Sequence, residues 1–176
     1  RREADRARLI AAVPLFAPLD DDERARLAGA ARVRLLEAGA TVVSADEPGG
    51  SMFIVAAGVL EVLIAEASND GAPRRVAVLG PGDVFGEMSM LTGAPRSASV
   101  RALSPATLCE IEHPAFAPLL AARPVLAEAL SRVVAEHQRR DAARREQEAG
   151  ASTSPAPSRG LAEQIAERIR RFFAGG

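Results

Sequence analysis

Between residues 33 and 112 the chain alternates apolar and polar residues in a series of short runs, each closed by turn residues. Alternation with a period of two is typical of strands that bury one face. The runs follow one another too closely for a helix between each pair, so an antiparallel barrel or roll is expected rather than parallel βαβ units. The predicted strands are Val33–Glu37, Thr41–Ser44, Ser51–Ala56, Val59–Ala65, Arg75–Leu79, Ser97–Ala102 and Thr107–Ile111.

Helical periodicity flanks this β-rich segment on both sides. Helices are expected between residues 2 and 31, where the acids of Asp20–Glu23 form a capped first turn rather than a metal site. After the strands, apolar residues at helical spacing predict one helix from Pro114 and another from Pro124 that fades by about Gly150. The predicted fold class is therefore α+β, an antiparallel β-roll with helices before and after it.

The composition changes twice beyond the last of these helices. Residues 150–159 contain ASTSPAPS, which is typical of a linker. From Gly160 the chain is helical again, with an apolar stripe made of Leu161, Ile165, Ile169, Phe172 and Phe173. Such a short helix is marginal in water. It is therefore expected to pack on the domain, to self-associate in a helical bundle, or to lie on an anionic membrane surface.

Overall composition excludes several classes of function. The formal net charge is -1 and the chain has no Trp or Tyr, so neither a basic nucleic-acid surface nor a base-stacking platform is expected. No apolar run approaches the roughly 20 residues that span a bilayer. No spacing of Ser, His, Asp or Cys suggests nucleophilic catalysis. We therefore expect no enzyme activity.

The cysteine and the histidines are too scattered for a metal site, and none is expected. Cys109 alternates like a strand residue and is interpreted as a small buried hydrophobe in a reducing cytoplasm rather than a reactive thiol. His113 precedes a predicted helix and is interpreted as a cap or surface residue.

One stretch, FGEMSMLTGAPRSASV at residues 85–100, interrupts the strand pattern. Gly86 allows a backbone conformation that other residues rarely adopt, and Glu87–Leu91 can form about one helical turn with exposed amides at its start. Gly93 and Pro95 then turn the chain back. This arrangement predicts a glycine-lined pocket with amide donors.

Two charged side chains belong to this stretch. Arg96 is followed by Ser97 and Ala98, whose small side chains leave their amides accessible. A guanidinium above amides suits a phosphate, while an ionised Glu87 only accepts hydrogen bonds and suits a hydroxyl. Phosphate beside hydroxyl predicts a nucleotide with its ribose. A surface salt bridge between Glu87 and Arg96 is the alternative, but the complete ordered pattern favours a ligand site.

The run from Gly86 to Ala98 resembles the phosphate-binding cassette of the cyclic nucleotide-binding domain family. That family includes the catabolite activator protein, kinase regulatory subunits and cyclic nucleotide-gated channels. The resemblance extends from about Leu15 to Arg140 and includes PGDVFGE and the turn at Gly58. It implies a β-roll flanked by helices that binds cAMP or cGMP, with a C-terminal lid helix and no metal.

The resemblance also assigns roles to residues of the cassette. Arg96 would pair with the cyclic phosphate, and the amides of Ser97 and Ala98 would add hydrogen bonds. Glu87 would accept a hydrogen bond from the ribose 2′-hydroxyl beside the backbone of Gly86. The remaining expected contacts are Met88 and, on the apolar side of the nucleotide, Val84 and Phe85.

By the same resemblance, the helix from Pro124 corresponds to the lid that closes over the base. Its candidate ligand residues are His137, Gln138 and Arg140. Family members that favour cGMP often carry Thr after the arginine, so Ser97 favours cAMP over cGMP.

These patterns divide the chain into three parts. A cyclic nucleotide-binding domain is expected at 1–149, a linker at 150–159 and an amphipathic helix at 160–176. Within the first part we expect helices at 2–31, the roll at 33–112, and hinge and lid helices at 114–148.

The chain begins with Arg1 inside a predicted helix, so we expect it to be part of a longer protein. The phrases LIAAVPLFAPLDDDERARLA and IRRFFAGG are similar to bacterial mechanosensitive-type, small-conductance-like channels that carry a cyclic nucleotide domain. The domain would then lie on the cytoplasmic side of the inner membrane, in a homo-oligomer formed by an upstream membrane region. Regulation of a fused enzyme or other effector stays open. A transcription factor is disfavoured because only a linker and one short helix follow the lid.

Overall fold

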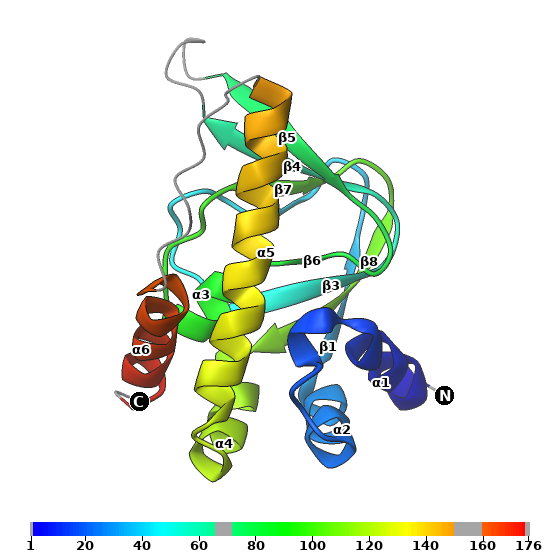
Figure 1. Ribbon diagram of the computed structural model, residues 1–176. Coiled ribbons are helices and arrows are strands. Elements are labelled where there is room, and N and C mark those ends of the chain that lie inside the picture. Colours follow the sequence, from blue (N-terminus) through cyan, green and yellow to red (C-terminus); the bar gives the residue numbers. More distant parts are fainter. Residues whose placement is uncertain (1, 66–71, 150–159, 175–176) are drawn as a thin grey trace.

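The computed structural model describes residues 2–65, 72–149 and 160–174. A β-roll lies beside a group of helices that includes both ends of the chain (Figure 1). In chain order the elements are α1 (Arg2–Ala12), the 3-10 helix η1 (Pro14–Phe16), α2 (Asp21–Ala30), β1 (Arg32–Leu36), β2 (Thr41–Val43), β3 (Ser51–Ala57), β4 (Leu60–Ala65), β5 (Pro73–Leu79), β6 (Val84–Phe85), α3 (Glu87–Thr92), β7 (Ser99–Ala102), β8 (Ala106–Glu112), α4 (His113–Ala122), α5 (Leu126–Ala149) and α6 (Gly160–Ala174).

The roll consists of two antiparallel four-stranded sheets, in the orders β1-β8-β3-β6 and β2-β7-β4-β5. Their inner faces meet in one apolar cluster, to which Phe53 and Leu108 contribute from the first sheet and Leu60 and Val100 from the second. The α+β fold class and the antiparallel roll are therefore confirmed.

The two central strands of the first sheet, β3 and β8, are buried on both faces. On β3 and β8 the residues that alternate with the inner cluster, among them Ile54 and Cys109, point to the other face and pack against the helices. This explains why most of β3 is apolar without a gap, since each face has its own core. Cys109 is buried as predicted, and burial raises the pKa of its thiol.

Helix α2 begins with a capping box. The Asp20 carboxylate accepts from the Glu23 amide at 2.8 Å, and the Glu23 side chain accepts from the Asp20 amide at 2.9 Å. Glu23 also accepts from Arg123 at 2.7 Å, which ties the end of α4 to α2. The acidic run therefore caps the helix, as the sequence indicated.

Three details differ from the sequence-based expectation. Strand β6 was not predicted, because a two-residue strand is too short to show a period. Helix α5 begins at Leu126 rather than at Pro124, since residues 124 and 125 form a turn that hydrogen-bonds into the helix. Strand β1 is an edge strand without a buried face, and Leu35 is 78% exposed.

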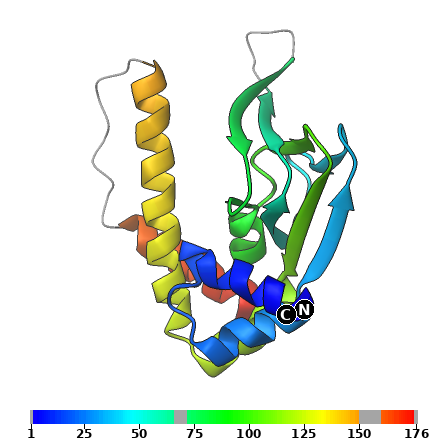
Figure 2. The same cartoon turned by 90° about the vertical axis from the view of Figure 1, so that its right-hand side faces the viewer.

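The last two helices lie on one side of the molecule. The C-terminal half of α5 stands apart from the roll, whereas α6 packs against both α5 and α3 (Figures 1 and 2). Of the three expectations for the terminal helix, the structure therefore shows packing on the domain. The predicted linker lies outside the described residues. No helix in the described ranges combines the length and hydropathy needed to cross a membrane.

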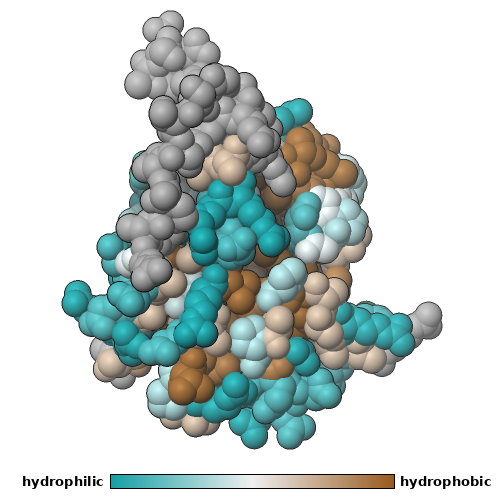
Figure 3. Space-filling view, in the orientation of Figure 1, coloured by the Kyte–Doolittle hydropathy of each residue, from teal (hydrophilic) through white to brown (hydrophobic). Residues whose placement is uncertain are grey.

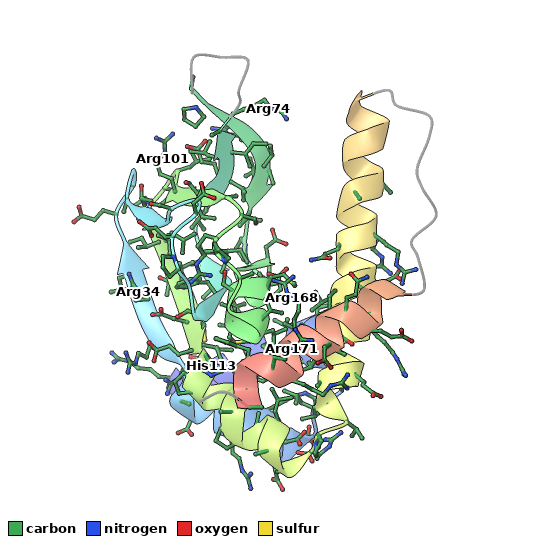
Figure 4. The ribbon with its side chains drawn as sticks, turned by 90° about the vertical axis from the view of Figure 1, so that its left-hand side faces the viewer. Arg34, Arg74, Arg101, His113, Arg168 and Arg171 are labelled. Carbon is green, nitrogen blue, oxygen red and sulfur yellow. The ribbon has the colours of Figure 1, made fainter. Side chains whose placement is uncertain are left out.

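A buried carboxylate links three strands on the outer face of the second sheet. Glu61 on β4 accepts hydrogen bonds from Arg101 on β7, which is labelled in Figure 4, and from Arg75 on β5, the latter at 2.8 Å. The hydrogen bonds from Arg101 and Arg75 lower the pKa of Glu61 below its usual range. Relative to its protonated form, ionised Glu61 is therefore more stable in the folded chain than in the unfolded chain.

We predict that the Glu61→Gln variant loses part of the acid sensitivity of folding. Because the folded pKa is lowered, the contribution of Glu61 is present above the usual glutamate pKa of about 4.3 and is lost as pH falls below it. Urea unfolding at a series of pH values from about 7 to about 3 measures this dependence. The variant should be less stable near neutral pH and should vary less between about pH 5 and about pH 3.

The matched control is Glu112→Gln, which removes an exposed ion pair with Arg32 at 3.5 Å. Its pH dependence should follow the wild type closely. Equal curves for Glu61→Gln and the wild type would contradict the assignment.

Candidate functional site

The stretch that interrupted the strand pattern forms β6, α3 and the turn after it. Helix α3 is bounded by two glycines in the left-handed region, Gly86 at φ 81° and Gly93 at φ 69°. Other residues rarely adopt this conformation, which accounts for glycine at both ends. Three consecutive residues of the helix, Ser89, Met90 and Leu91, are buried. The predicted helical turn is confirmed, and it is anchored in the helical core.

The chain then leads to Arg96, whose backbone pairs with the loop before β3. The Arg96 amide donates to the Glu47 carbonyl at 2.9 Å, and the Asp46 amide donates to the Arg96 carbonyl at 2.8 Å. The side chain is 7% exposed. Its guanidinium donates to the Ser51 carbonyl at 2.7 Å and lies over the ring of Phe53, 5.7 Å from the centroid.

Two glycines make room for this guanidinium. A Cβ atom at Gly49 would lie 2.3 Å from Nε of Arg96, and one at Gly86 would lie 2.5 Å from its NH1 atom. Both distances are far below a van der Waals contact. Gly86 also accepts a weak hydrogen bond from Arg96 at 3.5 Å. Gly49 and Gly86 thus form a glycine floor on which the arginine rests.

The electrostatic surroundings of Arg96 are mixed. Burial lowers the pKa of the guanidinium, and the negative charges of Glu110, Glu47 and Glu87 oppose that change. An arginine remains protonated under these conditions. The result is a buried cation whose hydrogen bonds go to neutral carbonyl groups, which is an arrangement suited to a phosphate.

The structure brings several of the predicted residues together. Glu87 and Met88 occupy the first turn of α3, half-buried, and Ser97 and Ala98 directly follow Arg96. Their contacts with a nucleotide stay a prediction. Phe85 is buried inside the roll, where its ring stacks on Phe53 at 4.9 Å, and Val84 packs on the helical core.

The lid candidates lie away from the cassette. Arg140 is exposed on α5 and pairs with Glu136 at 3.5 Å, while Gln138 is half-buried. This part of α5 stands apart from the roll (Figure 2). The side chain of His137 lies outside the described residues.

Sequence reasoning missed the residues that hold Arg96. In the sequence, Pro48-Gly49-Gly50 indicates only a turn before the next strand, and Glu47 and Glu110 carry no signal of a role in the site. The carbonyl of Ser51 and the ring of Phe53 reach the arginine only because β3 runs beside it. The glycine pair after a proline is the one sequence feature that could have drawn attention to this loop.

The interpretation of His113 as a cap or surface residue was wrong. Glu112 holds the cap position, and the ring of His113 packs against those of Phe172 and Phe173, at 4.2 and 4.1 Å. Its Nδ1 atom is buried without a hydrogen-bond partner in the described part of the chain. The reason is tertiary, because α6 returns to cover the start of α4. Among the described residues, no group of three or more His, Cys, Asp or Glu side chains could hold a metal ion.

Comparison with known proteins identifies the class of this fold and site. The family model of the cyclic nucleotide-binding domain matches residues 33–123, more than half of the chain. The chain belongs to this family.

Individual relatives fit this assignment. A cyclic nucleotide-gated potassium channel of Mesorhizobium japonicum is 37% identical over 74% of this chain and 34% of its own length. The cAMP-bound regulatory domain of a Toxoplasma gondii protein kinase A has a TM-score of 0.66 at 25% identity, covering 77% of this chain and 50% of that one. The N-terminal domain of a Streptomyces coelicolor transcriptional regulator has a TM-score of 0.63 at 30% identity, covering 84% of this chain and 99% of that one. The chain spans about a third of the length of the potassium channel.

We predict that Gly49→Ala weakens cyclic nucleotide binding by about tenfold or more, because the new methyl group displaces the Arg96 fork from its floor. Titration with a fluorescent cAMP analogue measures the change. Gly50→Ala is the matched control, since a Cβ atom at Gly50 meets nothing within 4 Å. Equal affinities of the two variants would show that the floor has no role in binding.

Proposed function

We propose that this chain is a sensor domain that binds cAMP in preference to cGMP and regulates an attached ion channel through movement of α5. The observation that carries the proposal is Arg96, a residue only 7% exposed whose guanidinium donates to the carbonyls of Ser51 and Gly86. Its position after α3 and the turn at Gly93–Pro95 matches the cassette pattern in order and spacing.

In this proposal each group of the cassette has one task. Arg96 donates to the exocyclic oxygens of the cyclic phosphate, and the amides of Ser97 and Ala98 donate further hydrogen bonds to the same anion. Glu87 accepts from the ribose 2′-hydroxyl. Hydrogen bonds to a charged group contribute about 1.5–3 kcal/mol each. Arg96 adds a positive charge and a bidentate fork to such bonds, so we expect it to contribute the largest share of the binding energy. Ser97 instead of Thr favours cAMP.

The proposed output is a shift of population between two positions of α5. The C-terminal half of α5 stands apart from the roll in this structure (Figure 2). A nucleotide that binds more tightly when α5 covers the site favours the covered state, and a tenfold preference corresponds to about 1.4 kcal/mol. His137, Gln138 and Arg140 are the residues that would then approach the base.

A channel as the effector is supported by the relatives, which include cyclic nucleotide-gated potassium channels of Mesorhizobium japonicum and Rhizobium etli. We propose a homo-oligomeric channel with this domain on the cytoplasmic side of a bacterial inner membrane. The mechanosensitive type rests on the sequence phrases at both ends of the chain. A second candidate is a sensor for a different effector, favoured by the same fold in kinase regulatory and transcriptional proteins.

We predict that the domain binds cAMP with micromolar or tighter affinity and cGMP more weakly. Arg96→Ala should weaken cAMP binding by about a hundredfold or more, since it removes one partner of a buried charged contact. Arg96→Lys keeps the charge without the planar fork, so its cAMP affinity should lie between those of the wild type and Arg96→Ala. Calorimetric titration measures all three.

Arg32→Ala is the control, because this arginine of the roll forms an exposed ion pair with Glu112. Thermal unfolding of each variant shows whether it is folded. If the folded wild type binds neither cAMP nor cGMP, the proposed function is wrong.

The effector is tested in the protein that carries this domain. In excised membrane patches, cAMP applied to the cytoplasmic side should change the open probability of the channel, and Arg96→Ala should shift the response to higher cAMP concentrations by a similar factor. If cyclic nucleotide binds without any change in current, the channel is not the effector, and the second candidate, a sensor for a different effector, is supported.

A further inference from the structure

Helix α6 contacts three elements that surround the proposed nucleotide site. It packs on α3, on the start of α4 and on the first half of α5. Figure 4 shows it crossing beside His113 and in front of α3, with Arg168 and Arg171 on it. The family model ends at residue 123, so α6 lies outside the matched region.

The contact with α3 is made at the C-terminal end of the cassette helix. A Cβ atom at Gly93 would lie 2.6 Å from Cε2 of Phe172, so the phenylalanine ring rests directly on the backbone of this glycine. Gly93 therefore satisfies two requirements, a left-handed φ and close approach by an aromatic ring. Six residues separate this contact from the Gly86 end of α3.

The contact with α4 is aromatic. Phe172 and Phe173 both contact the ring of His113, the first residue of α4, and the two phenylalanine rings meet edge to face at 5.7 Å, so the three rings form one cluster. Helix α4 connects β8 to α5. The aromatic contacts at His113 therefore restrain the helix through which α5 is attached to the roll.

The contact with α5 is a shared core. Ile165 and Ile169 are buried in the same cluster as Leu126 and Leu130 of α5, and Arg170 pairs with Glu128 at 3.5 Å. The side of α6 that faces outward is hydrophilic (lower left in Figure 3). Ile165 and Ile169 of the apolar stripe are thus covered by the chain itself, whereas Phe172 and Phe173 are half-buried.

We propose that α6 is an intramolecular restraint that holds α5 in its position apart from the roll and thereby lowers the affinity of the site for cyclic nucleotide. The proposal rests on the proposed function. By linking α3, α4 and the first half of α5, α6 stabilises their present arrangement. Movement of α5 over the cassette must change this arrangement and so weaken the contacts of α6. Coupling between sites is reciprocal, so bound nucleotide weakens the docking of α6.

The test compares nucleotide affinity with and without the aromatic contacts. The double variant Phe172→Ala/Phe173→Ala removes the rings from Gly93 and His113. It should bind cAMP about fivefold more tightly than the wild type in calorimetric titration, at the low end of known couplings. Glu163→Ala, on the exposed face of the same helix, is the matched control and should leave affinity unchanged. Unchanged or weaker binding by the double variant overturns the proposal.

A second measurement needs no variant. Hydrogen exchange of amides 162–174 in the wild type should become faster when cAMP is added at saturation, because the ligand weakens α6 docking. Slower or unchanged exchange contradicts the restraint. The two proposals fail in different ways. Wild-type cAMP binding with no effect of the aromatic variant rejects the restraint alone, whereas the absence of binding rejects the nucleotide site and the restraint with it.

Discussion

The structure around the site depends on the burial of one cation. A guanidinium removed from water is costly unless hydrogen bonds and opposite charges replace its hydration. Arg96 obtains these from the Ser51 carbonyl on β3 and from the negative charges of Glu110 on β8, Glu47 in the loop before β3 and Glu87 at the start of α3. Gly49 and Gly86 are glycines because the same cation occupies the space of their side chains. The order of the strands, the path of the loops and the positions of the glycines around the cassette therefore all serve to hold Arg96.

The cassette also lies where the two apolar cores of the molecule meet. Phe85, just before it, belongs to the core inside the roll, and Met90 and Leu91 within it belong to the core between the roll and the helices. The residues that flank Arg96 and Glu87 in the cassette therefore pack into the helical core. Helix α6 contacts the far end of α3 and the start of α4 together, so the C-terminal helices adjoin the ligand site directly.

Most of the fold could be predicted, because period and turn residues are local. The strands of the roll were located to within about two residues, and the capping box of α2 followed from Asp20 and Glu23. Strand β6 could not be predicted, since two residues show no period and their pairing with β3 is a tertiary fact. The exposure of Leu35 was equally hidden, because an alternating strand looks the same whether or not a helix covers its face.

For the site, the sequence alone determined the order of groups: a glycine, a glutamate, one helical turn, a second glycine and an arginine before two small residues. These are chemical requirements of neighbouring residues, so they are visible in a linear pattern. Only the tertiary structure decided what Arg96 touches, why Gly49 differs from Gly50, and that Phe172 rests on Gly93. Those contacts join residues dozens of positions apart, and packing in three dimensions, which has no linear signature, selects them.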